Sequence, residues 1–407
     1  MSSAITNRPL RIVYVCPRYA AAAAGGAEAL IQSWAERMKE RGHHSEVLTT
    51  CARDHSTWKN ELPPGEEMIN GIPVHRFEIT SRNREKQDFY GGRIIHGEPL
   101  TRGQEEEWID AVAWSEPLRG FIEQNRTRFD CFIFAPYLFG VTYRGMPAAP
   151  GRSILVPCLH DEPYAYLKIF RDLFSSAAGI FFNSEPERRL ADRIFSLPRE
   201  RCRVVGMGIE PPAKKPQPDR FREKYGIDSP YLLYAGRREG GKNTPLLIEY
   251  FRLFKRHRGT DLRLCLLGTG EVALRGDDRR WILDAGYVSG EDKRDAYAGA
   301  FAFCQPSTNE SFSIVLLESW LEGKPALVND FCPVTRDHCL RSGGGLYFRD
   351  YFEFEECLLY LLDYPAQARR MGENGRRYVE YNYAWGQILD KLEEGLKACF
   401  NRRSEEH

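Results

Sequence analysis

Short apolar runs alternate with stretches of helical periodicity along the chain. In the first half, apolar and β-branched runs predict strands at 12–16, 46–50, 74–77, 131–135, 154–159, 179–183 and 204–205. Apolar residues recur at helical spacing from Leu30 to Met38, and Gly42 follows as a C-terminal cap. Strands that alternate with helices are typical of βαβ units. The pattern therefore predicts an α/β protein with parallel sheets.

The same alternation resumes after a proline-rich interruption from Pro211 to Pro218, which excludes a continuous helix or a central strand there. Further strands are predicted at 231–235, 262–267, 285–288, 301–305, 326–328 and 345–348, and a helical region at 373–400 with a break at 383–386. A chain of 407 residues is longer than a typical domain with a single hydrophobic core. We therefore predict two Rossmann-like domains, at 1–210 and 211–384, whose parallel sheets face a central cleft. The helix at about 385–400 is expected to pack back on the first domain.

One segment lacks a clear period. Residues 82–110 are rich in arginine, glutamate and glutamine. This composition predicts an irregular loop close to an acceptor substrate.

The composition narrows the classes of partner. Lys and Arg number 57 and balance 57 Asp and Glu, so no global charge attracts nucleic acid. The 11 cysteines occur singly, without metal-site spacing, which suits a reducing cytoplasm. The N-terminus has no apolar run as long as that of a signal peptide, and no segment has the roughly 20 apolar residues of a membrane span. A soluble cytoplasmic protein is therefore expected. The oligomeric state is not indicated.

A basic, aromatic stretch from Tyr166 to Phe174 leaves peripheral contact with a lipid surface open. The favoured interpretation is a half-buried amphipathic helix.

Two cations follow the strand predicted at 231–235. Gly236 and Arg237 come directly after it, and Lys242 precedes a helix. Ligands of open α/β sheets bind at the carboxyl ends of strands, and a helix N-terminus favours anions. Arg237 and Lys242 therefore predict a phosphate site, with a solvated basic loop as the alternative.

Two carboxylates flank the start of another helix. Glu310 lies in the loop after a strand, Ser313 and Ile314 open the helix, and Glu318 lies within it among apolar neighbours. Free N–H groups at such a helix start bind phosphate. The pattern predicts one carboxylate for sugar hydroxyls and a buried one, Glu318, for a ribose diol. An exposed helical glutamate is the alternative for Glu318, which its apolar neighbours disfavour.

Glu310 and Glu318 match the E-x(7)-E motif, and the chain resembles the retaining GT-B fold glycosyltransferases of family 4, the glycosyl transferases group 1. Other segments that resemble the family, in order along the chain, are Gly25-Gly26-Ala27-Glu28, Arg41-Gly42-His43, Gly236-Arg237 with Lys242, Gly268-Thr269-Gly270-Glu271 and Gly323-Lys324-Pro325. The sequence departs from the family pattern at Ser313, where a glycine is usual, and in the alanine run from Ala20 to Ala24.

The resemblance implies transfer of a hexose from a nucleoside-diphosphate sugar, such as a UDP- or GDP-sugar, to a hydroxyl of a glycan, lipid-linked or small-molecule acceptor. Configuration would be retained, and neither a cofactor nor a metal is expected because the chain has no Asp-x-Asp motif. Arg237 and Lys242 would neutralise the leaving diphosphate, Glu310 would hold the hexose, and Glu318 would bind ribose. The remaining donor-binding residues would be Gly25, Gly26, Gly268, Ser313 and Ile314.

Acceptor-side candidates lie in the first domain. His160 and Asp161 follow the strand predicted at 154–159, and Ser184 follows the next one. In the family a residue at the first of these positions contacts sugar or acceptor, which makes His160 a further catalytic candidate. A core histidine is the alternative for His160. A capping box from Ser184 to Glu187 accounts for Ser184 without function.

Other classes remain open. A nucleoside-diphosphate-sugar epimerase would share this architecture, and a non-catalytic sugar-nucleotide binding protein would share the site. A nicotinamide dehydrogenase requires G-x-G-x-x-G after its first strand, where this chain has Pro17-Arg18-Tyr19.

Overall fold

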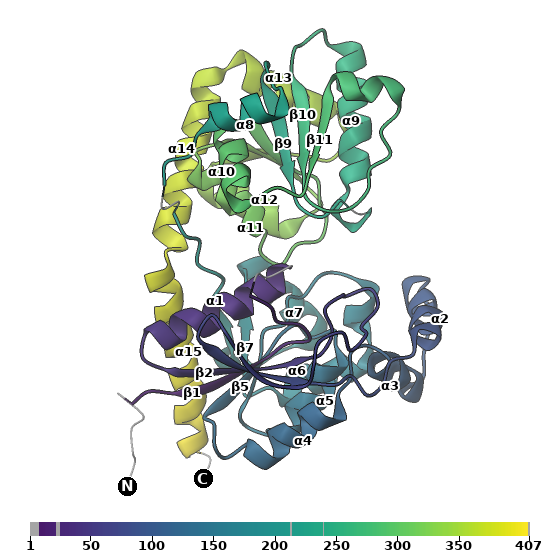
Figure 1. The fold of residues 1–407 in the computed structure, drawn as a ribbon, viewed down its shortest axis with the longest axis vertical. Helices are drawn as coiled ribbons and strands as arrows, with labels where there is room; N and C mark the ends of the chain where they lie inside the picture. Colours follow the sequence, from purple (N-terminus) through teal and green to yellow (C-terminus); the bar gives the residue numbers. More distant parts are fainter. Residues whose placement is uncertain (1–7, 22–24, 212–213, 239, 406–407) are drawn as a thin grey trace. The chain divides into compact units, whose positions relative to one another are not determined.

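The structure is a computed structural model that describes residues 8–21, 25–211, 214–238 and 240–405. The chain forms two compact units (Figure 1). The first comprises Met1–Met207 with Ile388–His407, and the second comprises Gly208–Gln387. The divisions lie close to the junctions at 210 and 384 that the sequence suggests.

The first unit is built on a sheet of eight strands in the order β3-β4-β2-β1-β5-β6-β7-β8. Their bounds are β1 Arg11–Val15, β2 His44–Thr50, β3 Gly65–Ile69, β4 Ile72–Phe77, β5 Cys131–Phe134, β6 Ser153–Leu155, β7 Gly179–Phe182 and β8 Cys202–Val204. All neighbours are parallel except β3 and β4. Strand β3 was not predicted, because four of its five residues are exposed and no apolar alternation marks it.

Strand β6 is shorter than predicted. It ends at Leu155 instead of residue 159. Pro157 follows, and Cys158 has a left-handed backbone with φ 52°, which is incompatible with a continuing strand. His160 therefore lies in a loop beyond the strand.

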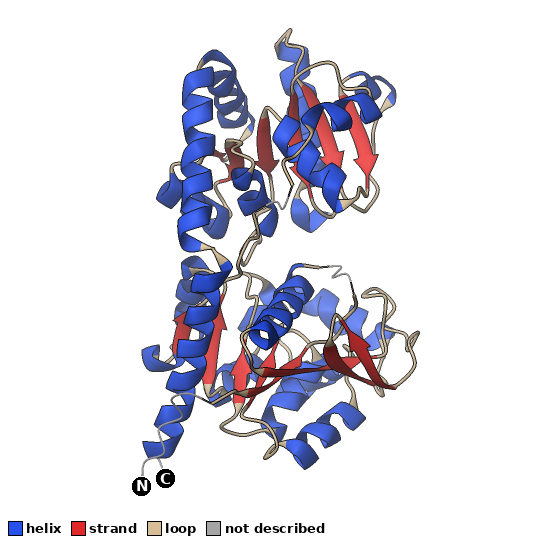
Figure 2. Ribbon diagram, turned by 60° about the vertical axis from the view of Figure 1, so that its left-hand side comes forward, coloured by secondary structure: helices blue, strands red, loops and turns tan. Residues whose placement is uncertain are grey.

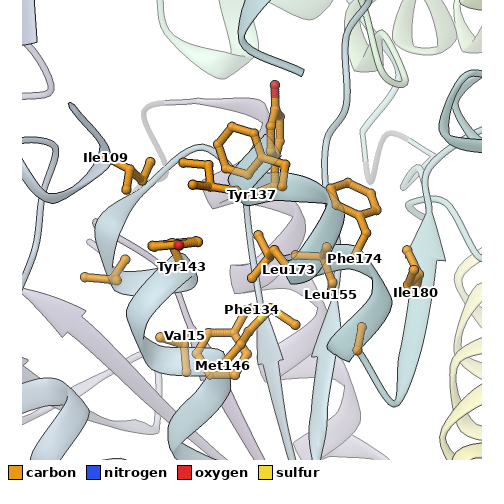
Figure 3. Close-up of a cluster of buried hydrophobic side chains, with 14 of the residues drawn as sticks. Val15, Ile109, Phe134, Tyr137, Tyr143, Met146, Leu155, Leu173, Phe174 and Ile180 are labelled. Atoms are coloured by element: carbon orange, nitrogen blue, oxygen red, sulfur yellow. The ribbon is translucent and has the colours of Figure 1, made fainter. Parts of the chain in front are cut away.

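The described residues of the first unit also form eight α-helices, several of which lie against the sheet (Figure 2). They are α1 Gly26–Glu40, α2 Arg84–Ile95, α3 Arg102–Asp110, α4 Glu116–Asn125, α5 Gly140–Gly145, α6 Lys168–Ser176, α7 Glu185–Phe195 and α15 Trp385–Glu405. Helix α1 buries Leu30, Trp34 and Met38, as its period predicts, and Gly42 follows it with φ 92°. Phe134 of β5, Leu155 of β6 and Phe174 of α6 belong to one buried cluster between sheet and helix (Figure 3).

The prediction of an irregular loop at 82–110 is wrong, because α2 and α3 occupy most of it. Asn83 caps α2 by accepting from the Lys86 N–H, and Thr101 forms a capping box with Gln104 before α3. Trp108 of α3 then stacks on Tyr164 with ring centroids 5.0 Å apart. The caps were present in the sequence, but the few apolar residues concealed the helices.

Helix α6 confirms the amphipathic interpretation of the stretch from Tyr166 to Phe174. Ile169, Phe170, Leu173 and Phe174 are buried, while Tyr166 is half exposed. Among the residues that the structure describes, no helix combines the length and the apolar character needed to cross a membrane.

The second unit has a sheet of six strands, all parallel, in the order β11-β10-β9-β12-β13-β14. The strands are β9 Tyr231–Ala235, β10 Arg263–Leu267, β11 Ile282–Gly286, β12 Ala302–Gln305, β13 Ala326–Asn329 and β14 Gly345–Phe348. The helices are α8 Pro218–Tyr225, α9 Thr244–His257, α10 Gly290–Gly299, α11 Ile314–Leu321, α12 Pro333–Ser342, α13 Tyr351–Asp363 and α14 Pro365–Asn382. The chain is thus α/β with two Rossmann-like units, as predicted.

The end of the chain returns to the first unit. Helix α14 stops at Asn382 and α15 begins at Trp385, so the predicted break is confirmed. Arg41, just after α1, forms ion pairs with Asp390 and Glu393 on α15 at 2.6 and 3.0 Å. Helix α15 is therefore part of the first unit's structure although it follows the second unit in the sequence.

Candidate functional site

The loop after β9 places two adjacent arginines in different surroundings. Arg237 is exposed, and its carbonyl accepts from the Tyr234 hydroxyl at 2.6 Å. Arg238 is buried instead and forms an ion pair with Asp284 on β11. Sequence reasoning missed Arg238, because its role depends on a strand that is distant in the chain.

Gly268, after β10, has a structural reason to be glycine. Its φ is 121°, and a Cβ there would lie 1.9 Å from the Gly236 carbonyl oxygen. The loops after β9 and β10 are thus in direct backbone contact, which only glycine permits. The donor-binding role of Gly268 stays a prediction.

The structure brings Lys242 and Glu310 together. Glu310 Oε1 lies 2.8 Å from Lys242 Nζ, and Gln305 Nε2 donates to the same oxygen at 2.8 Å. The Glu310 side chain is 11% exposed and that of Lys242 23%. Gln305 was missed, because an amide at the end of an apolar strand carries no signal without its tertiary partner.

Ser313 begins α11 in a strained conformation. It is the N-cap with φ 67° and ψ 68°, in the left-handed region that favours glycine. Its hydroxyl is buried and, within the described residues, has no hydrogen-bond partner. The following N–H groups of Ile314 and Val315 open the helix, where an anion is favoured.

A buried histidine supports the loop before α11. His338 Nε2 lies 3.2 Å from the Phe312 carbonyl oxygen, and its Nδ1 lies 3.1 Å from the Tyr378 hydroxyl. Burial lowers the pKa of His338 to about 4, although the Phe312 carbonyl opposes this. The imidazole is therefore neutral near pH 7, with Nε2–H donating to Phe312.

Glu318 is placed differently from the expectation of burial, which is wrong. Its side chain is 31% exposed and forms an ion pair with Lys293 at 2.6 Å. The Tyr297 hydroxyl also donates to Glu318 Oε2, at 3.2 Å. Its neighbours Leu316 and Leu317 are buried, so Glu318 lies on the opposite, open side of α11. Lys293 and Tyr297, both on α10, were missed.

The first unit presents Gly25 and Gly26 at the start of α1. Gly25 is the N-cap in extended backbone, and a Cβ on it would lie 2.9 Å from Glu28 Oε2. Glu28 in turn pairs with Arg18 at 2.5 Å. The carboxylate of Glu28 therefore already lies beside this helix N-terminus. Of the alanine run from Ala20 to Ala24, residues 22–24 lie outside the described residues.

The loop with His160 and Asp161 is partly occupied by internal contacts. His160 is half-buried. Asp161 accepts from the Tyr166 hydroxyl at 2.7 Å and pairs with Arg193 at 2.6 Å. An acceptor bound by Asp161 would have to share these partners.

Ser184 is buried and caps α7 by accepting from the Glu187 N–H at 3.3 Å. The buried Glu187 carboxylate reaches further than a capping box requires, accepting from Leu159 N and Asn183 N at 2.6 Å each. Burial raises the pKa of Glu187 to about 8, although the hydrogen bonds from these N–H groups lower it. Glu187 thus joins the loops that carry His160 and Ser184.

Within the described part of the chain, no group of three or more His, Cys, Asp or Glu residues is placed to hold a metal ion.

Comparison with known proteins places this site in a family. Residues 217–378 match the family model "Glycosyl transferases group 1", and this range contains every second-unit residue discussed above. The chain is 23% identical to the D-inositol 3-phosphate glycosyltransferase of Kineococcus radiotolerans, over 94% of this chain and 92% of that protein. The second unit therefore matches the group 1 glycosyltransferases, and the chain as a whole is similar to a glycosyltransferase over most of its length.

Solved structures show the same fold as this chain. The sucrose-phosphate synthase of Thermosynechococcus elongatus aligns with a TM-score of 0.72 at 16% identity, covering 97% of this chain and all of that one. Anabaena HepE, in complex with UDP and glucose, aligns with a TM-score of 0.71 at 15% identity over 96% of this chain and all of that one. The predicted GT-B class is therefore confirmed.

Proposed function

We propose that this glycosyltransferase moves a hexose from a nucleoside-diphosphate sugar to an acceptor hydroxyl, with retention of anomeric configuration and without a metal ion. The observation that carries the proposal is the pair of Lys242 Nζ and Glu310 Oε1, 2.8 Å apart, in the loops that open α9 and α11. The complex of Anabaena HepE with UDP and glucose supports this class of donor.

Lys242 and Arg237 would act on the leaving diphosphate. As the glycosidic bond breaks, negative charge grows on the departing phosphate. Preorganised cations and the N–H groups at Ile314 stabilise that charge more than they stabilise the ground state. Two cations and a helix start can serve one diphosphate in place of a divalent ion.

The two carboxylates would hold the two sugars of the donor. Glu310 would accept from hydroxyls of the transferred hexose, and Glu318 from the ribose diol. Glu318 is half-exposed, so a ribose can reach it. Lys293 and Tyr297 fix its Oε2, which orients the carboxylate before the ribose arrives.

The acceptor side is assigned to the first unit, with His160, Asp161 and Ser184 as its residues. Front-face attack lets the departing phosphate take the proton of the acceptor hydroxyl, so no dedicated protein base is required. The eleven cysteines are all free thiols, which supports a reducing, cytoplasmic setting for the reaction.

Lys242→Ala tests the phosphate role. Loss of one preorganised charge donor is expected to lower kcat by roughly 100-fold, or about 3 kcal/mol. Turnover would be measured with the donor identified by thermal-shift screening of UDP-, GDP- and ADP-sugars. Lys397→Ala, which removes a half-exposed lysine of α15, is the control and should leave turnover unchanged. Activity of Lys242→Ala within a few-fold of wild type would remove the phosphate assignment.

The reaction itself has a predicted outcome. Product should form at an undiminished rate in excess EDTA, because the diphosphate is neutralised by protein groups. NMR of the product should show the anomeric configuration of the donor. Strict dependence on Mg²⁺ or Mn²⁺, or an inverted anomer, would contradict the mechanism. Incubation without acceptor that yields an isomerised donor would instead identify an epimerase, and binding without turnover a sugar-nucleotide binding protein.

A further inference from the structure

Gln305 is a polar residue in an apolar place. It is the last residue of β12, its Cα pairs with Val328 on β13, and it is 2% exposed. Its Oε1 is buried and, in the described part of the chain, has no hydrogen-bond partner. An unpaired buried acceptor costs free energy, so folding alone would favour an apolar side chain here.

The amide makes one directed contact. Its Nε2 donates to Glu310 Oε1 at 2.8 Å. Turning the amide would set its oxygen against the carboxylate, which only accepts, so the orientation of Gln305 is fixed. A charge-assisted bond from a buried donor is stronger than one between neutral groups.

Lys242 contacts the same oxygen but from a more exposed position. It lies at the end of a short 3-10 helix before α9 and is 23% exposed. In contrast, Gln305 is part of the sheet. The adjacent carbonyl of Pro306 accepts from Asn243 at 3.2 Å and from Asn329 at 3.1 Å. Of the two donors to Glu310, Gln305 is the one that stays in place when a ligand draws Lys242 away.

We infer that Gln305 is a positioning residue for the transferred sugar, which holds Glu310 in place while Lys242 turns to the diphosphate. The inference rests on the proposed function. Both contacts of Glu310 use Oε1, and among the described residues none reaches Oε2. Gln305 thereby leaves Oε2 for a hydroxyl of the hexose.

The first test separates recognition of the sugar from recognition of the diphosphate. Dissociation constants of the full chain are measured for UDP and UDP-glucose, GDP and GDP-mannose, and ADP and ADP-glucose. Gln305→Met, which keeps the length but removes the donor, should leave the affinity for the diphosphate unchanged and weaken its sugar conjugate about tenfold. An unchanged ratio of the two constants would overturn the inference and leave the proposed function intact.

A double-mutant cycle shows whether Gln305 acts through Glu310. Glu310→Ala should change the ratio at least as much as Gln305→Met, and the double variant should change it no further. Additive effects would show that Gln305 acts elsewhere. Gln367→Met, on the exposed part of α14, is the matched control and should behave as wild type.

A pH profile provides a readout that a packing role would not change. In Gln305→Glu the introduced carboxyl faces Glu310, so the two share one proton. When protonated it can donate as the amide does, and it repels Glu310 once the proton leaves. The kcat/KM of Gln305→Glu should therefore fall with rising pH through an ionisation that wild type and Gln305→Met lack. A profile parallel to wild type would contradict the inference.

Thermal stability separates a structural role of Gln305 from a positioning role. Gln305→Met should have a Tm equal to or above that of wild type, since it removes an unpaired buried oxygen. A large loss of stability would instead indicate a structural role. If wild type binds none of the six probes, the proposed function falls and the inference falls with it.

Discussion

At the scale of single residues, Ser313 has an unusual backbone conformation at the end of the loop between β12 and α11. Its φ is 67°, and the N–H groups that follow it are the first of α11, which have no partner within the helix. The position requires a backbone N–H and a left-handed turn, and the side chain contributes only a buried hydroxyl without a partner in the described structure.

Ser313→Gly is expected to raise the free energy of unfolding by about 1 kcal/mol, because glycine adopts φ 67° without steric cost. Urea denaturation of the full chain measures the change. Ser311→Gly, two residues earlier and without a left-handed φ, should stabilise nothing. Equal effects of the two substitutions would contradict the strain at Ser313.

Residue types at the site were predictable only where the chain itself carried the signal. Lys242 and Glu310 lie in the loops that follow apolar strands, and Glu318 interrupts an apolar stretch, so each charge is conspicuous in the sequence. Gln305 and Lys293 were missed because each gains its role from a partner on another element. The exposure of Glu318 was mispredicted because its apolar neighbours in the sequence lie on the other side of α11.

At the scale of elements, α12 and α14 support the loop before α11 through one buried imidazole. His338 on α12 joins Tyr378 of α14 to the carbonyl of Phe312. Tyr378 also bonds the Tyr383 hydroxyl at 3.2 Å, which continues the network to the end of α14.

His338 makes stability depend on pH. The pKa is lowered to about 4 by burial when folded, against about 6.5 when unfolded. As pH falls from 6.5 to 4 the unfolded chain takes up a proton that the folded chain refuses, so about 3 kcal/mol of stability, complete above pH 6.5, is lost. Denaturation curves of wild type and His338→Gln across this range measure it. Parallel curves for the two proteins would contradict a neutral buried His338.

The helices and strands that are buried were predicted well, because burial requires a recognisable pattern of apolar residues in the sequence. Strand β9 was predicted at its observed bounds, since it is a short, fully buried apolar run in a parallel sheet. Exposed elements gave no such pattern: β3 was missed, and α2 and α3 were taken for a loop. The capping residues of α2 and α3 were the signal that could have revealed these helices, because their hydrophobic periodicity is too weak to do so.

At the scale of the whole molecule, the first unit depends on a segment from the end of the chain. Gly395 of α15 faces Phe181 of β7, and a Cβ on Gly395 would lie 2.9 Å from the Phe181 ring. Helix and sheet are thus in close contact at this point, with no space for a methyl group.

Gly395→Ala is therefore expected to lower the free energy of unfolding by about 1–3 kcal/mol through overpacking. Gly120→Ala, in the middle of α4 with nothing within 4 Å of its Cβ position, should raise it by up to about 1 kcal/mol through helix propensity. Thermal denaturation of both variants provides the comparison. Stabilisation by both would show that α15 is not packed at Gly395.

The return of α15 also fixes an order of events during synthesis. Residues 388–407 leave the ribosome after the whole of 208–387, yet they belong to the same unit as the residues before 208. The sheet of the first unit therefore waits, with Phe181 uncovered, until the second unit has emerged. A premature stop shortly before residue 388 would harm the first unit more than the second.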